Sequence, residues 1–119
     1  MLNIRLTTIA SAMVMTLALV GCANKPTNLY QWQGYQKNVD DYLRADKQGL
    51  DVQVQSMEED LQKIRTSGGA VPPGYHAHLG LLYGKQGKTE QFAQQMQIEK
   101  KLFPESETFV DFLLRNFKK

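Results

Sequence analysis

The two histidines of this chain are the side chains whose type would suit metal binding or proton transfer. His76 and His78 are two positions apart, which places them about 200° apart around a helix and prevents them from sharing one metal ion. The sequence offers no second cysteine and no carboxylate cluster that would complete a metal site. We therefore expect no metal, and histidines that are exposed or partly packed on a helix.

Two acidic runs, Asp40-Asp41 and Glu58-Glu59-Asp60, could supply a carboxylate pair for general acid–base catalysis. Both lie among polar residues on predicted helices, where a solvated charge is the ordinary state. Ser67 and Ser106 are not part of a recognisable nucleophile elbow. The sequence therefore predicts that the protein is not an enzyme.

Gly87-Lys88-Thr89 is similar to the end of a phosphate-binding P-loop. That motif requires a further glycine five positions before Gly87, where Leu82 stands, and a preceding strand where this sequence predicts a helix. We expect a turn between two helices, with Thr89 as the N-cap of the second, and no nucleotide.

The composition indicates one small globular domain. The chain has 119 residues, 42% of them hydrophobic and 22% charged, with a formal net charge of +2. These values exclude a disordered chain and give no electrostatic reason to expect a nucleic-acid partner. The single cysteine cannot form an intramolecular disulfide, so packing alone must hold the fold together.

The N-terminal segment, residues 1–21, differs from the rest of the chain. Arg5 is its only ionised side chain, and residues 6–20 are mostly apolar or small. This pattern is typical of a secretory signal peptide; the alternative is an uncleaved signal anchor.

Leu19-Val20-Gly21-Cys22 resembles the lipobox of bacterial lipoproteins. The resemblance implies cleavage between Gly21 and Cys22, a diacylglycerol on the Cys22 sulfur, and a fatty acyl group such as palmitate on the new amino terminus. This covalent lipid would leave no free thiol for chemistry. Ala23 replaces the aspartate that favours inner-membrane retention, which implies a lipid-anchored protein of the outer membrane, facing the periplasm.

The chain after the cysteine divides into a short lipidated tether, residues 22–28, and a domain, residues 29–119. Apolar residues recur at helical spacing, and no stretch alternates with period two, so we expect an all-α domain of about five helices. The helices are expected at about 35–44, 51–66, 75–86, 89–102 and 106–117, with Asp51, Thr89 and Ser106 as N-caps. The expected core stripes are Tyr35, Val39, Tyr42 and Leu43; Leu50, Val54, Met57, Leu61 and Ile64; Leu79, Leu82 and Tyr83; Phe92, Ala93, Met96 and Ile98; and Phe109, Val110, Leu113, Leu114 and Phe117.

Leu79, Gly80, Tyr83, Gly87 and Pro104 have the separations of a tetratricopeptide repeat, in which two helices form a hairpin. In such a repeat Gly80 permits close helix approach, Gly87 turns the chain and Pro104 ends the second helix. We expect tetratricopeptide-like hairpins with the last helix as a C-terminal cap.

The match to the repeat has three departures. Phe92 and Glu99 stand where the repeat usually has alanine, and His76 stands where tryptophan is common, so an ordinary helical hairpin is the alternative. No second copy of the repeat is visible, although about three repeats are normally needed for stability. Binding of a partner, or self-association, is therefore expected to stabilise the domain.

Three aromatic residues, Tyr30, Trp32 and Tyr35, follow the tether. They could pack under the first helix, or they could form an exposed contact patch, since tyrosine and tryptophan are enriched in binding hot spots. Both interpretations can hold for different rings.

Three separated motifs resemble a family of small bacterial outer-membrane lipoproteins of unknown function. They are the LYxWxGY pattern at 29–35, VPPG followed by LGLLY at 71–83, and FPES at 103–106. Gln33 stands where this family is expected to have glycine, so the local turn is expected to differ. Members are usually encoded beside a lipoprotein similar to the curli secretion channel, which implies a shared envelope complex but supplies no catalytic residues.

These features together predict an outer-membrane lipoprotein that acts as a protein–protein adaptor or assembly accessory in the cell envelope. The expected partner is another envelope protein, with a curli-channel-like lipoprotein as the candidate. The alternative is a structural factor that contacts peptidoglycan or modulates its synthesis.

Overall fold

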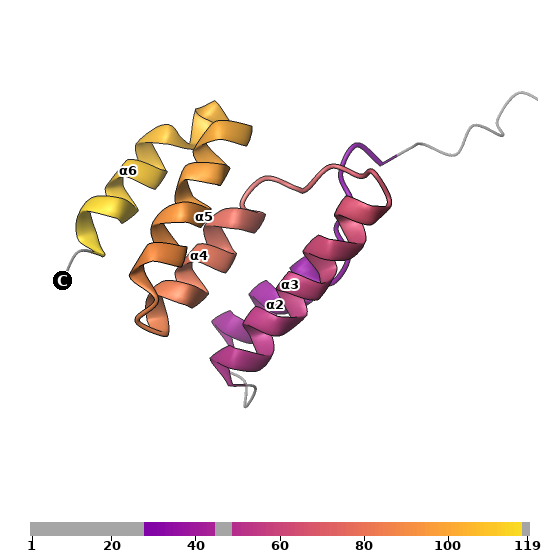
Figure 1. The fold of residues 1–119 in the computed structure, drawn as a ribbon, viewed down its shortest axis with the longest axis horizontal. Helices are drawn as coiled ribbons and strands as arrows, with labels where there is room; N and C mark the ends of the chain where they lie inside the picture. Colours follow the sequence, from indigo (N-terminus) through magenta and orange to yellow (C-terminus); the bar gives the residue numbers. More distant parts are fainter. Residues whose placement is uncertain (1–27, 45–48, 118–119) are drawn as a thin grey trace, which may run out of the picture.

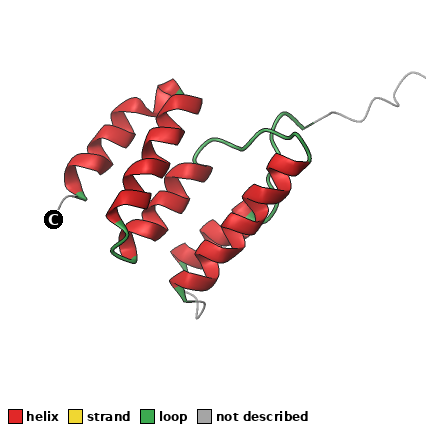
Figure 2. Cartoon of the chain, viewed as in Figure 1, coloured by secondary structure: helices red, strands yellow, loops and turns green. Residues whose placement is uncertain are grey.

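The computed structural model describes residues 28–44 and 49–117, and this part of the chain consists of helices joined by loops, without a strand (Figures 1 and 2). The helices are α2 (Tyr35–Leu43), α3 (Leu50–Thr66), α4 (Tyr75–Lys85), α5 (Thr89–Leu102), the 3₁₀ helix η2 (Pro104–Ser106) and α6 (Glu107–Asn116). The all-α prediction is therefore confirmed. The predicted signal segment and lipobox, with Gly21 and Cys22, lie outside the described residues.

The helices form two antiparallel hairpins, α2 with α3 and α4 with α5, followed by α6 against α5 (Figure 1). Gly80 lies at the α4–α5 contact, where a Cβ would be 3.2 Å from the Gln95 Cβ and 3.3 Å from the Phe92 carbonyl oxygen. Gly87 turns the chain between these helices with φ of 76°, a backbone region that favours glycine. Gly80 and Gly87 therefore lie at the close contact and at the turn of this helical hairpin.

One continuous core joins four of the helices. Its most deeply buried apolar side chains are Met57 and Ile64 of α3, Tyr75, Leu79 and Leu82 of α4, Met96 of α5 and Val110 of α6. Most of the predicted core residues are thus buried or partly buried.

Two predicted core residues are exposed. Leu43 is 73% exposed. The buried side of α2 carries Asn38 and Asp41, and Leu43 lies on the opposite side of the helix. Phe109 is 52% exposed, because α6 is the last helix of the row and has a neighbour on one side only (Figure 1). A helical stripe gives the period of the buried positions but does not identify how many sides of the helix are covered.

Two of the three predicted N-caps, Asp51 and Thr89, are wrong, whereas Ser106 does occupy the N-cap position of α6. Gly49 and Lys88 occupy the N-cap positions of α3 and α5, so Asp51 and Thr89 lie inside those helices. Ser106 does precede α6, but its hydroxyl donates to a carbonyl of the preceding turn at 2.7 Å and leaves the helix amides without a side-chain cap.

Gln33 has a φ of 42°, the left-handed conformation in which a side chain costs about 1 kcal/mol or more. Replacing Gln33 by glycine is therefore expected to raise the free energy of unfolding by up to about 1 kcal/mol. Gln97→Gly, at an exposed position inside α5, is the control and is expected to lower it by about 1 kcal/mol. Urea unfolding of both variants measures whether the free energy of unfolding rises or falls. A loss of stability in Gln33→Gly would contradict the assignment of backbone strain to Gln33.

Candidate interaction surface

The segment before α2 is fixed against the end of α3 and the loop that follows it (Figure 1). The Gln31 amide donates to the Ala70 carbonyl at 2.9 Å, and the Ser67 hydroxyl donates to the Gln31 side-chain oxygen at 2.8 Å. The Gly34 amide donates to the Asp60 carboxylate at 2.9 Å. The aromatic residues of this segment are therefore held in defined positions.

The three predicted aromatic residues take different environments. Tyr35 packs inward, with its ring centroid 5.2 Å from that of the fully buried Tyr75. Trp32 stacks on Tyr35 at 6.0 Å and remains 41% exposed. Tyr30 turns instead to Phe103, at 6.2 Å. Tyr35 is thus a packing residue, whereas Trp32 offers a partly exposed ring for contact.

An open cleft of about 410 Å³ lies beside Tyr30 at the same end of the molecule. Its lining comes from the first described segment, the loop after α3 and the end of α5: Tyr30, Gly69, Ala70, Val71, Leu102 and Phe103. Leu102 is 50% exposed at its edge and Leu29, next to Tyr30, is 76% exposed. We call Leu29, Tyr30, Trp32 and Leu102 the tether-end surface, because the chain enters the domain here.

Glu99 is a buried carboxylate that the repeat pattern did not anticipate. It is 2% exposed, and its two oxygens accept hydrogen bonds from the amides of Gly74, at 2.6 Å, and Ala77, at 3.2 Å. These amides belong to the N-terminus of α4, which has no side-chain cap of its own. Burial, and then the negative charge of Glu99, raise the pKa of Tyr35. Glu99 therefore caps a neighbouring helix, which explains its presence where the repeat has alanine.

Both histidines are buried, so the expectation that they are exposed or partly packed is wrong. His76 shares a 2.7 Å hydrogen bond with the Gln95 side-chain oxygen, and the His78 ring lies edge-on to Tyr42 at 5.2 Å. Over residues 28–44 and 49–117, no group of three histidine, cysteine or acidic side chains lies where it could hold a metal ion.

Acidification is expected to destabilise the domain through these histidines. Burial lowers the pKa of both His76 and His78 below the ordinary 6.5, so the folded protein binds fewer protons than the unfolded chain as the pH falls through that value. The free energy of unfolding should be constant above pH of about 7 and decrease below about 6.5. Urea unfolding at several pH values measures this, and the decrease should be smaller in His76→Gln/His78→Gln. Equal stability across this range would contradict it.

Two acidic residues predicted to be solvated are buried. Asp41 accepts a hydrogen bond from the Lys37 ammonium at 2.5 Å, and Asp60 accepts from the Lys63 ammonium at 2.8 Å as well as from the Gly34 amide. The bond from the Gly34 amide shows that Asp60 holds the segment before α2 against α3, whereas the Lys37–Asp41 pair lies within α2.

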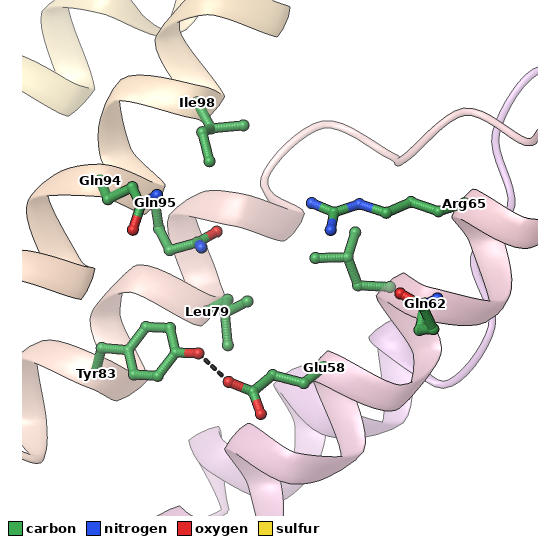
Figure 3. A pocket seen from close by; sticks show the side chains of 9 residues that line it. Glu58, Gln62, Arg65, Leu79, Tyr83, Gln94, Gln95 and Ile98 are labelled. Carbon is green, nitrogen blue, oxygen red and sulfur yellow. Dashed lines mark hydrogen bonds between the residues drawn. The ribbon is translucent and has the colours of Figure 1, made fainter.

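A second open groove, of about 370 Å³, lies between α3 and the second hairpin (Figure 3). Apolar and polar side chains line it: Leu61, Leu79 and Ile98, with Glu58, Gln62, Arg65, Tyr83, Gln94 and Gln95. The Tyr83 hydroxyl donates to the Glu58 carboxylate across the groove. Burial, and then the hydrogen bond to Glu58, raise the pKa of Tyr83 from the ordinary 10 to about 12.

The remaining sequence motifs have structural positions. Gly87 and Lys88 form the turn between α4 and α5, and the Lys88 ammonium lies 5.7 Å from the centroid of the Tyr83 ring. A helix, not a strand, precedes this turn, unlike the strand that leads into a P-loop. Pro104 begins η2 directly after α5 has ended.

None of the described helices has the length and hydrophobicity that crossing a bilayer requires. No curated protein and no solved structure matches the chain. A family model does match residues 29–113, which run from the tether-end surface into α6. The chain belongs to the family described as Domain of unknown function (DUF4810).

Proposed function

We propose that this protein is an outer-membrane lipoprotein, anchored through Cys22, that acts as a protein–protein adaptor in the cell envelope. The observation that carries the adaptor role is the tether-end surface: Leu102 is exposed at the edge of an apolar cleft that Tyr30 also lines, and Leu29 and Trp32 are exposed on the same segment as Tyr30. Exposed aromatic and large aliphatic side chains around a cleft are typical of protein contact sites.

The position of this surface fits an anchored protein. Leu29 lies seven positions after Cys22, and an extended chain spans at most about 25 Å over these seven steps. A lipid on Cys22 would therefore keep the tether-end surface close to the membrane. A partner that is itself in the outer membrane would therefore lie within reach of this surface. The family resemblance makes a curli-channel-like lipoprotein the candidate partner.

The polar groove supports binding rather than catalysis. Its acidic group, Glu58, is hydrogen-bonded to Tyr83, and the raised pKa of Tyr83 makes it a poor proton donor or acceptor near neutral pH. Its other polar side chains are amides and one guanidinium, from Arg65, which bind but do not serve as nucleophiles. We therefore propose no enzymatic activity.

Photocrosslinking in cells tests the adaptor role. Benzoylphenylalanine would replace Trp32 or Leu102 of the tether-end surface, and Val52, which is 53% exposed near the opposite end of α3, would be the control position. We expect one envelope protein crosslinked from Trp32 and Leu102 but not from Val52. Equal products from all three positions, or none, would contradict the proposal. Products found only with the peptidoglycan sacculus would instead favour a structural factor of the cell wall.

A further inference from the structure

The last helix, α6, has two apolar faces. One face joins the core, where Val110 is fully buried and Phe117 stacks on Phe92 with ring centroids 4.4 Å apart. The other carries Phe109 and Phe112, which are 52% and 55% exposed. No described element covers these two rings, because α6 ends the row of helices (Figure 1). In helical arrays the terminal helix usually has a polar outer face, so an apolar outer face at the end of the array is expected to be covered by another protein surface.

The exposed face is held in a fixed orientation. The Lys100 ammonium of α5 lies 2.8 Å from the Glu107 carboxylate and 3.1 Å from that of Asp111, and both acidic residues are on α6. Together with Val110, this pair of contacts fixes the rotation of α6 about its axis. Phe109 and Phe112 therefore form a preformed surface.

The arrangement of residues along this face suits pairing with a second copy of α6 that runs in the opposite direction. Phe109, Phe112 and Asn116 lie on α6 and Glu105 lies in η2 just before it; these four positions are spaced by four, three and four residues, so the spacing is the same in both directions. Exposed Glu105 lies at the start of the face and exposed Arg115 at its end. An antiparallel copy would place Phe109 against Phe112 and Glu105 near Arg115, twice by symmetry, whereas a parallel copy would place like charges together.

We propose that α6 forms a two-fold antiparallel interface with α6 of a second copy of this chain. The inference is independent of the proposed function, because it uses neither the lipid nor the tether-end surface. The interface has two half-exposed phenylalanines on each side, which is small for a protein–protein contact, so the dimer is weak in solution. Any attachment that concentrates the copies on one surface would favour it.

Sedimentation velocity over a range of concentrations tests the dimer. The sample is the chain from residue 22, with Cys22→Ser to prevent disulfide-linked pairs; it contains every residue of the described core. We expect a concentration-dependent dimer, weakened about tenfold or more by Phe109→Ser with Phe112→Ser. Leu43→Ser with Val52→Ser, two apolar positions that are 73% and 53% exposed, is the control and leaves the dimer unchanged. A monomer at all concentrations, or a dimer insensitive to the phenylalanine pair, would overturn the proposal.

Charge exchange tests the antiparallel arrangement. Glu105→Arg alone and Arg115→Glu alone should each weaken the dimer several-fold, and the two changes in one chain should restore it. Circular dichroism confirms that each variant is folded, since both positions are exposed. Single changes without effect, or a double variant that fails to restore association, would overturn this arrangement.

Discussion

Replacing Glu99 by alanine is expected to lower the free energy of unfolding by about 3 kcal/mol, because it leaves two amides at the buried start of α4 without an acceptor. The amides are those of Gly74 and Ala77, and the carboxylate also carries a charge that favours a helix N-terminus. For a domain of this size such a loss corresponds to a fall in the melting temperature of about 15 °C. Urea unfolding and thermal unfolding both measure it.

Two further variants separate the cap from a general effect of removing an acid. Glu99→Gln keeps one acceptor oxygen without the charge, so we expect an intermediate loss of about 1–2 kcal/mol. Glu59→Gln changes an exposed glutamate and should alter stability by less than about 0.5 kcal/mol. If Glu99→Ala were as stable as the unmodified chain, the remote cap would have no energetic role.

Replacing Gly80 by valine is expected to destabilise the domain by about 2–3 kcal/mol through overpacking of the α4–α5 hairpin. A Cβ at this position would already lie 3.2 Å from the Met96 Cε and 3.3 Å from a backbone oxygen, and valine adds two methyl groups to it. The helices must separate to admit them. Thermal unfolding monitored by circular dichroism measures the loss.

Gly80→Ala is the graded control for this prediction. Its single methyl group requires the neighbouring side chains to shift by a few tenths of an ångström, and the higher helix propensity of alanine offsets that cost by about 1 kcal/mol. We expect a net change within about 1 kcal/mol of zero. Tolerance of valine as good as that of alanine would show that close approach at Gly80 does not hold the hairpin together.

The helices and turns were predictable because their signals are local. Apolar spacing of three and four residues marks α3 and α5, and Gly87 marks the turn between α4 and α5 because it alone accepts the required φ at low cost. The residues of the repeat signature also follow from short-range packing. These features need no knowledge of which distant segments meet.

The buried polar residues were not predictable for the opposite reason. Glu99 caps amides that lie 22 and 25 positions earlier, and Asp60 binds an amide 26 positions earlier. No helix-length pattern encodes such pairs. The sequence contained one indication of this role, because Glu99 stands where the repeat usually has alanine. A charged residue at a packing position indicates either that the position is exposed or that the charge has a buried partner. Gln33 likewise stands where glycine is expected, and its positive φ explains that expectation.

The candidate surface was only partly predictable. Tyr30, Trp32 and Tyr35 are close together in the sequence. Which of these rings is buried and which is exposed depends on the positions of α3 and of the loop that follows it, and the local sequence does not determine these positions. In the structure Tyr35 packs against the core, whereas Trp32, stacked on Tyr35, is partly exposed, and Leu102 from the end of α5 lies at the same end of the molecule. A residue 70 positions away from Trp32 joins the same end only through the fold.

The most direct test of an anchored adaptor is crosslinking from Trp32 in the native envelope, compared between the unmodified chain and Cys22→Ser at equal expression. We expect one crosslinked envelope protein with the unmodified chain and its loss in Cys22→Ser, while the purified domains of both show the same thermal unfolding. The same crosslinked protein at the same yield in both would contradict the requirement for the anchor, and no crosslinked protein in either would contradict the adaptor role.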